Sequence, residues 1–377
     1  MSSRASHTHP RKDNMRWGYT TGTCAAVAAR AALLHLLYGS KNKVVEIVLP
    51  SAERLKVPIA SYSLQGSRAT AGVVKDAGDD LDVTQGITVY ATVELNKCPG
   101  QIELNAGKGV GTVTKPGLAV PVGEAAINPV PRQMIGESVK DILPPEKGVM
   151  VTVSIPEGCE VAEKTFNSRL GIEGGISVLG TTGRVKPMSR EAYLESLYPQ
   201  LDQALALGFR EVLLTPGNKG VCRAQELQID TDRVVQTGNF VGEMLDACIE
   251  KEVEGVLLFG HLSKLVKLAA GVFNTHSRVA DARRETLAVH AALAGATRET
   301  VAGIMELNTL EASLPLLRKE GLESVFHTLA EVAAIKCRQR MLDKIKVGMV
   351  FYSLDGDIIG YNQEALEMGE RWGCPLQ

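Results

Sequence analysis

The alternation of apolar and polar positions divides the chain into two halves of different character. Between residues 43 and 155, β-branched runs that alternate with polar residues predict mostly antiparallel strands. Beyond residue 167, short apolar runs end in small polar turns and lead into helical patterns, which is typical of a parallel doubly wound sheet. We therefore expect a two-domain α/β fold, with an N-terminal α+β domain (residues 16–166) that carries a mostly antiparallel sheet and a C-terminal Rossmann-like domain (residues 167–377). The polar residues 1–15 predict a disordered tail.

The first half opens with an alanine-rich helix predicted over residues 25–38, which is apolar on nearly all sides and should be buried. Thr21 or Thr23 can cap its first turn, and the free N–H groups there predict an anion site. Cys24 is expected to pack as a small buried thiol rather than react. Strands are predicted over residues 43–49, 55–59, 68–75, 86–95 and 149–155.

The second half alternates predicted strands with helices and ends in a hairpin signal. The strands are expected at 176–179, 211–214, 234–236 and 256–259, and the helices at 190–207, 241–252, 263–270, 284–294, 310–319 and 322–345. Residues 347–353 and 358–361 should pair around Asp355-Gly356, a two-residue turn that is strongly typical of a hairpin.

Composition narrows the class of protein only moderately. The chain has 377 residues, 45% of them hydrophobic, and a net charge of −2, which suits a soluble globular enzyme and argues against a broad nucleic-acid surface. The 7 cysteines include no C-x-x-C pair, so we expect reduced thiols in a cytoplasmic protein and no zinc site. No apolar run approaches the ~20 residues that a membrane span requires.

Polar loops at the predicted strand ends are the first candidate site, because open α/β sheets bind ligands there. They contain Gly180, Thr181, Thr182 and Gly183; Thr215, Gly217 and Asn218; and Gly238 and Asn239. The stretch 256–284 adds polar residues in quick succession, namely Lys264, Lys267, Thr275, His276, Ser277, Asp281 and Arg283. A lysine-rich solvated helix followed by a capping loop explains this stretch equally simply, and that alternative stays open.

In the first half, Asp76 and Asp79 lie in an acidic loop after a predicted strand. The loop is either a turn held by Asx hydrogen bonds or a set of carboxylates available to a ligand or a proton transfer. The glycine-rich residues 107–117 lack the spacing of a P-loop, and the chain has no G-x-G-x-x-G. The residue pattern alone therefore indicates a two-domain α/β enzyme with a polar cleft.

Several long motifs resemble the CbiD-type cobalt-precorrin-5B C(1)-methyltransferases of anaerobic cobalamin biosynthesis. The motifs lie at residues 18–26, 74–80, 107–117, 126–132, 174–183, 265–271 and 274–281. Leu81 stands where the family pattern has proline and Ser263 where it has glycine, which leaves the neighbouring polar residues in place. The resemblance implies methyl transfer from S-adenosylmethionine to carbon 1 of a cobalt-containing tetrapyrrole, giving cobalt-precorrin-6A. Since the cobalt arrives inside the macrocycle, it implies no protein-bound metal.

On that basis we expect the strand-end loops named above to hold the methyl donor on the second domain, and Asp76, Asp79 or His276 to move a proton. The residues expected to bind the tetrapyrrole are Thr20, Thr21, Thr23, Lys75, Lys115, Arg132, Lys264, Lys267, Thr275, Ser277, Asp281 and Arg283. Further expected partners are neighbouring cobalamin-pathway enzymes and a second copy in a homodimer, with no nucleic acid and no membrane. A nucleotide-dependent kinase and a non-catalytic tetrapyrrole carrier are the alternative functions.

Overall fold

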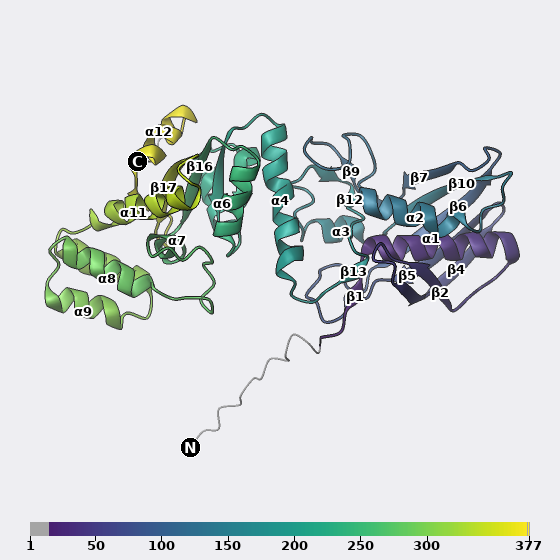
Figure 1. Cartoon of the computed structure of the whole chain (residues 1–377), viewed down its shortest axis with the longest axis horizontal. Coiled ribbons are helices and arrows are strands. Elements are labelled where there is room, and N and C mark those ends of the chain that lie inside the picture. The colour runs from purple at the N-terminus through teal and green to yellow at the C-terminus, as the bar shows by residue number, and fades with distance from the viewer. Residues whose placement is uncertain (1–14, 375, 377) are drawn as a thin grey trace, which may run out of the picture. The chain divides into compact units, whose positions relative to one another are not determined.

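The structure is a computed structural model that describes residues 15–374 and residue 376. The chain is a mixed α/β protein with several sheets, and it forms two compact units, unit 1 ending at Tyr193 and unit 2 beginning at Leu194 (Figure 1). Apart from Met15, the predicted tail lies outside the described residues.

Unit 1 contains most of the strands. They are β1 (Gly18–Tyr19), β2 (Val44–Val48), β3 (Arg54–Pro58), β4 (Ser61–Gln65), β5 (Arg68–Val74), β6 (Thr88–Asn96), β7 (Ile102–Ala106), β8 (Gly109–Val110), β9 (Thr112–Val113), β10 (Gly148–Ser154), β11 (Ile172–Glu173), β12 (Gly175–Ile176) and β13 (Arg184–Val185). Its helices are α1 (Thr21–Tyr38), α2 (Pro129–Lys140) and α3 (Gly158–Ala162).

Unit 2 contains the remaining elements, except that α4 begins just before the division. The strands are β14 (Glu211–Thr215), β15 (Val234–Gln236), β16 (Gly255–His261), β17 (Lys346–Tyr352) and β18 (Ile358–Tyr361). The helices are α4 (Arg190–Ala206), α5 (Asn218–Glu226), α6 (Val241–Glu250), α7 (Leu262–Ala269), α8 (Arg283–Leu293), α9 (Arg298–Glu306), α10 (Ser313–Lys319), α11 (Val325–Arg340) and α12 (Gln363–Arg371), with 3-10 turns η2 (Thr231–Arg233) and η3 (Leu310–Ala312).

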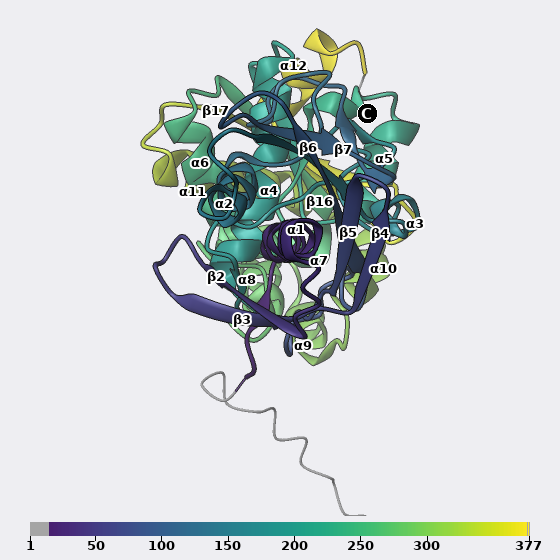
Figure 2. The same ribbon diagram turned by 90° about the vertical axis from the view of Figure 1, so that its right-hand side faces the viewer.

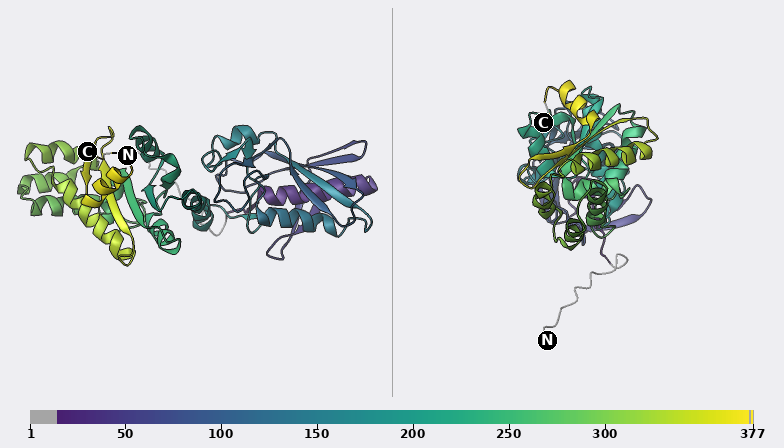
Figure 3. Two further views of the ribbon diagram at one scale, coloured as in Figure 1. Left: turned by 90° about the horizontal axis from the view of Figure 1, so that it is seen from above. Right: turned by 90° about the vertical axis from the view of Figure 1, so that its left-hand side faces the viewer.

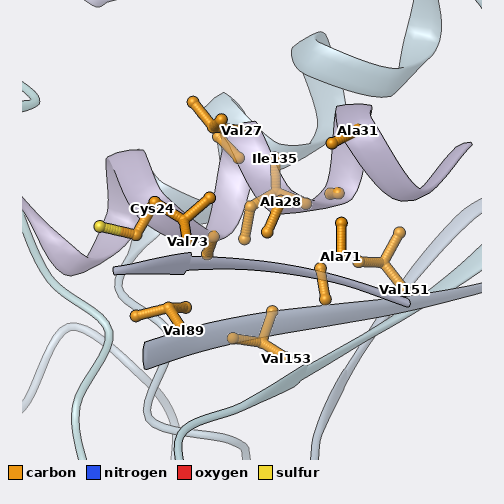
Figure 4. Packing of buried hydrophobic residues seen from close by; sticks show 14 of the residues in the cluster. Cys24, Val27, Ala28, Ala31, Ala71, Val73, Val89, Ile135, Val151 and Val153 are labelled. Atoms are coloured by element: carbon orange, nitrogen blue, oxygen red, sulfur yellow. The ribbon is translucent and has the colours of Figure 1, made fainter. Parts of the chain in front are cut away.

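The core of unit 1 forms between α1 and a five-stranded sheet of order β4-β5-β6-β10-β7. The sheet is antiparallel except where β7 runs parallel to β10, so the predicted mostly antiparallel sheet is confirmed. Figure 2 shows α1 nearly end-on beside β5. Its small side chains let the sheet approach closely: Cys24 and Ala28 lie on the side of α1 that faces Val73, whereas Val27 lies on the opposite side near Ile135 (Figure 4).

The helix α1 also passes the length and composition test for a membrane span. Among the described residues no other helix does so, and 72% of its apolar window is buried within the protein. Its position over the sheet accounts for its apolar character as a core helix.

The segment 167–193 pairs with strands of unit 1, although the sequence groups it with the second domain. There β11 pairs with β9, β12 with β8, and β13 with β1. The prediction that residues 176–179 form a strand of the parallel sheet is therefore wrong. The short strand β12 pairs instead with Gly109 and Val110. The loop 180–183 consequently belongs to unit 1.

Unit 2 is built on a sheet of order β15-β14-β16-β17-β18, in which only β18 runs antiparallel to its neighbour. Alternate residues face opposite sides: Leu257 and Val350 pack with α5 and α12, whereas α7 and α11 pack on the other face. Helices therefore cover both faces of this sheet, as the green and yellow ribbons of Figure 3 show. The predicted β17–β18 hairpin is confirmed.

Candidate functional site

The carboxyl ends of the parallel strands meet at one edge of the unit 2 sheet. Thr215 at the end of β14 is in register with Gln236 at the end of β15, and His261 is in register with Tyr352. The amide of Thr237 donates to the Thr215 carbonyl at 2.8 Å, which ties the two adjoining loops together. The polar loops predicted after β14, β15 and β16 thus lie at one edge, as parallel strands require.

Asn239 connects the loop after β15 to the loop after α7. Its carbonyl accepts from the Thr275 amide at 2.9 Å, and its side-chain Oδ1 accepts from Thr275 Oγ1 at 3.1 Å and from Lys264 Nζ at 3.0 Å. Phe240 and Asn274 form a β-bridge beside them. The structure therefore brings Asn239, Lys264 and Thr275 together from three separate segments.

Lys267 is buried on α7, with 2% of its surface exposed. Its Nζ donates to the carbonyls of Thr275 at 3.0 Å and Ala280 at 2.9 Å, so the ammonium group fastens both ends of the loop 275–280. Burial lowers the pKa of Lys267. We conclude that Lys267 shapes the loop from inside and does not present its charge on the surface.

At the end of that loop, Asp281 pairs with Arg283 through two contacts of 2.6 and 2.7 Å. The hydrogen bond from Arg283 lowers the pKa of Asp281 to about 2. His276 and Ser277 are exposed, and His276 Nδ1 accepts from the Arg278 amide at 3.1 Å. The Arg283 guanidinium is thus neutralised by its neighbour, which weakens the prediction that it binds a ligand carboxylate.

The loop that joins β14 to α5 is shaped by Thr215, Gly217 and Gly220. Thr215 is fully buried, and its Oγ1 has no hydrogen-bond partner among the described residues. A Cβ at Gly220 would lie 1.8 Å from this oxygen, so the close approach of α5 to β14 requires glycine there. Asn218 is exposed at the first position of α5.

In unit 1, three predicted substrate-binding threonines instead hold the loop 179–183. Thr21 Oγ1 donates to the Leu179 carbonyl at 3.2 Å, and Thr23 Oγ1 donates to the Gly183 carbonyl at 2.7 Å. A Cβ at Gly180, whose φ is +136°, would lie 2.3 Å from Thr20 Oγ1. The expected placement of residues 180–183 with the second domain is therefore wrong, because these contacts join the loop to α1.

At the start of α1, where the sequence predicts an anion site, two of the N–H groups bond within the protein. Thr20, rather than Thr21 or Thr23, caps the helix by accepting from the Thr23 amide at 3.2 Å, and the Gly22 amide donates to Leu179. The N–H groups of Gly22 and Thr23 are thus not free to bind an anion. Cys24 is fully buried, which confirms it as a packed thiol, and burial raises its pKa to about 12.

The acidic loop of unit 1 is organised by Arg16, a residue that the sequence analysis did not identify. Both guanidinium nitrogens of Arg16 pair with Asp76, and its amide donates to Asp79 Oδ2 at 2.7 Å. The hydrogen bond from Arg16 lowers the pKa of Asp76, so its carboxylate is held in the ionised form. Arg16 and Asp76 are 60 residues apart, and no local pattern links them.

The remaining predicted cations of unit 1 are engaged in structure. Lys75 is 2% exposed and pairs with Asp82 at 2.5 Å, while Arg132 donates to the Ile127 carbonyl at 2.7 Å and pairs with Glu124 at 3.0 Å. The Lys115 side chain lies over Gly171. These three cations belong to unit 1, whereas the strand-end loops belong to unit 2. No cluster of His, Cys, Asp and Glu suited to a metal occurs among residues 15–374.

Fold and site together define a mixed α/β protein in which polar loops gather at the carboxyl edge of a largely parallel sheet. The CbiD family model matches residues 8–187, and the model for the CbiD C-terminal domain matches residues 274–363. The chain belongs to the CbiD family.

Curated relatives extend the similarity over almost the whole chain. A cobalt-precorrin-5B C(1)-methyltransferase of Desulfitobacterium hafniense is 45% identical and covers 97% of this chain and 95% of its own. The protein of the same name from Moorella thermoacetica is 47% identical over 95% of this chain and 98% of its own. A crystal structure of the cobalamin biosynthesis protein CbiD from Archaeoglobus fulgidus is 28% identical, covers 72% of this chain and 84% of its own, and has a TM-score of 0.38.

Proposed function

We propose that this protein methylates carbon 1 of cobalt-precorrin-5B with S-adenosylmethionine, giving cobalt-precorrin-6A in cobalamin biosynthesis. The observation that carries the proposal is the 45–47% identity, over nearly the full length, to proteins named for this reaction. The cobalt is part of the substrate, so the protein needs no metal of its own for this chemistry.

The methyl donor binds, in this proposal, at the strand-end loops of unit 2. Thr215, Gly217 and Asn218 follow β14, and Gly238 and Asn239 follow β15, so both loops reach the same edge of the sheet. The parallel strands of this sheet, with helices on both faces, support a Rossmann-like site in which the donor binds at the strand ends. The hydrogen bonds that join Asn239 to Thr275 and Lys264 keep the second loop in place.

Positioning then supplies much of the rate enhancement. The sulfonium group of the donor activates the methyl group, so the protein must align that carbon with carbon 1 of the ring and exclude water. No side chain needs to act as a nucleophile. Asp76, Asp79 and His276 stay predictions as proton-transfer groups, and the lowered pKa of Asp76 favours a role as an ionised partner of Arg16 over a role as an acid.

Unit 1 is proposed to contact the apolar ring of the tetrapyrrole. Three large apolar side chains are exposed around its acidic loop: Trp17 (51%), Leu81 (92%) and Met188 (58%). Trp17 bridges to Gly78, and the Met188 amide donates to Asp80 Oδ1 at 2.8 Å, so these residues border one loop. The homodimer, the neighbouring pathway enzymes and a cytoplasmic location stay predictions.

Calorimetry with S-adenosylhomocysteine tests the donor site. We expect the wild-type protein to bind it, and Asn239→Ala to bind it about tenfold more weakly, because the variant loses the acceptor that aligns Lys264 and Thr275. Asn105→Ala, which changes an exposed asparagine on β7 in unit 1, is the matched control and should bind normally.

The possible outcomes distinguish an error in the proposed donor site from an error in the proposed function. Methyl transfer by the wild type together with full binding by Asn239→Ala would move the donor away from these loops and leave the function intact. A wild-type protein that binds the tetrapyrrole but neither binds S-adenosylhomocysteine nor transfers a methyl group would be a carrier. ATP hydrolysis in place of methylation would support the kinase alternative.

A further inference from the structure

A cavity of about 270 Å³ opens in unit 2 at the start of α8. It is lined by Asp281, Arg283, Arg284, Leu307, Asn308 and Leu310. The volume is well above the ~30 Å³ that one water molecule occupies in the liquid, so a small polar group of a ligand fits inside.

The cavity has an excess of one positive charge, which is carried by Arg284. Asp281 neutralises Arg283, as the two contacts between them and the lowered pKa of Asp281 show. Arg284 Nη1 donates to the carbonyls of Met305 at 2.9 Å and Leu307 at 3.2 Å. No carboxylate among the described residues forms an ion pair with Arg284, so its guanidinium is oriented by backbone and keeps donors for a ligand.

The helix dipole disfavours the positive charge of Arg284 at its position in α8. Arg283 and Arg284 are the first residues of α8, and Ala282 provides no side-chain cap. Glu285 is the acidic residue of this first turn, and Asp281 before it is paired with Arg283. A carboxylate in the cavity would be attracted both by the guanidinium and by the helix dipole. Because a guanidinium can bind a carboxylate through two parallel hydrogen bonds, a carboxylate is the anion that this geometry fits best.

The cavity lies near the edge where the parallel strands end. Leu310 begins η3, and the next residue, Glu311, accepts from His261 Nε2 at 3.0 Å at the end of β16, because His261 Nδ1 itself accepts from the Ser263 amide. Glu311 also accepts from the Leu354 amide at 2.8 Å, just after β17. The part of the cavity wall that contains Leu310 is therefore joined, through Glu311, to the edge that carries the loops proposed for the methyl donor.

We propose that this cavity is a subsite for one carboxylate side arm of the tetrapyrrole, with Arg284 as its charged partner and Asn308 as a further hydrogen-bonding group. The inference rests on the proposed function, because that function supplies a substrate with many carboxylates. It assigns to Arg284 the role that the sequence analysis gave to Arg283.

Kinetics of the full-length protein with Arg284→Gln tests the subsite. We expect the KM for the tetrapyrrole to rise about tenfold, while kcat and the KM for S-adenosylmethionine change less than twofold. Arg284→Lys keeps the charge but lacks the planar guanidinium, so its KM for the tetrapyrrole should lie between those of the wild type and Arg284→Gln. Arg298→Gln, which changes an exposed arginine at the start of α9, is the matched control and should behave as wild type.

Absorbance titration of cobalt-precorrin-5B into the same variants measures the dissociation constant of the tetrapyrrole without turnover. Weaker binding by Arg284→Gln alone supports the inference even if methyl transfer is absent, in which case the proposed function fails and the subsite stands. An unchanged dissociation constant for Arg284→Gln overturns the inference. A loss of kcat and of melting temperature with unchanged KM also overturns it, since it would show that Arg284 only ties α8 to residues 305–307.

Discussion

The polar clusters of the two units differ in how far their side chains are already engaged. In unit 1, Thr23, Lys75 and Arg132 make hydrogen bonds or ion pairs with other parts of the same unit. In unit 2, the buried Lys267 plays a similar internal role, but Asn218, His276 and Ser277 are exposed at or next to the strand ends. The comparison indicates that a clustered polar motif can serve mainly to join distant segments, and that the unit 2 edge keeps more groups available for a ligand.

The largest expected effect is on the stability of unit 2, through Lys267→Met. The substitution leaves the carbonyls of Thr275 and Ala280 without their donor, which should cost about 2–4 kcal/mol of unfolding free energy. Urea unfolding in a Trp17→Phe background measures this, because the chain has 2 tryptophans and Trp372 then reports on unit 2 alone.

Lys264→Met is the matched control for that experiment. Lys264 is three residues earlier on α7, is exposed, and bonds only Asn239 among residues 15–374, so its loss should cost less than ~1 kcal/mol. Equal losses for the two variants would mean that the buried ammonium group does not hold the loop 275–280.

A smaller effect is expected in unit 1 from Thr23→Val, which keeps the shape and removes one hydroxyl. The Gly183 carbonyl loses a buried hydrogen bond of 2.7 Å, so stability should fall by about 1–2 kcal/mol with no change in the KM for S-adenosylmethionine. Hydrogen exchange should rise at the Gly22 amide, which donates to Leu179 in the same junction.

Thr182→Val tests whether the loop 180–183 contacts the methyl donor, because Thr182 is exposed on this loop and was expected to bind the donor. If this variant raises the KM for S-adenosylmethionine while stability is kept, the loop 180–183 contacts the donor despite its place in unit 1, and the contrast between the units fails.

The smallest effect is expected for Asp281→Asn, and it depends on pH. The pKa of Asp281 is about 2 in the folded protein, below its ordinary value of 3.8, so the ionised group stabilises the fold above pH ~4 and that stabilisation disappears as the pH falls toward 2. Asp281 is 41% exposed, so solvent screening should limit the difference to less than ~1 kcal/mol.

Urea unfolding of the wild type and Asp281→Asn between pH 6 and pH 3 measures this difference. The gap in unfolding free energy should be constant above pH ~5 and shrink below pH ~4. A variant that is more stable than the wild type at pH 6 would show that Asp281 has a raised pKa and is not held by Arg283.

The sequence predicts the regular parts of this fold well for a physical reason. Long apolar strands such as β14 and β16 carry their own pattern, and the turn at Asp355-Gly356 is encoded locally. The two-residue strands β8 and β12 have no period to detect, so their pairing, which moves residues 167–193 into unit 1, depends on contacts distant in sequence. Helices α3, α5, α9 and α12 were not predicted.

In the candidate site, too, the positions that follow from local patterns could be predicted and the contacts between distant segments could not. The strand-end position of Thr215 and Asn239 could be predicted, because it follows from parallel strand order. The pairing of Arg16 with Asp76, of Glu311 with His261, and the position of Arg284 beside a cavity could not, since each joins segments whose spacing carries no periodic signal.

The central claim is that the methyl donor binds at the strand-end loops of unit 2, and hydrogen–deuterium exchange of the full-length protein with and without S-adenosylhomocysteine tests it most directly. The account predicts that the ligand slows exchange at residues 217–218 and 237–240 and leaves residues 20–24 and 180–183 unchanged. Slower exchange confined to residues 20–24 and 180–183 would contradict it and would place the donor on unit 1.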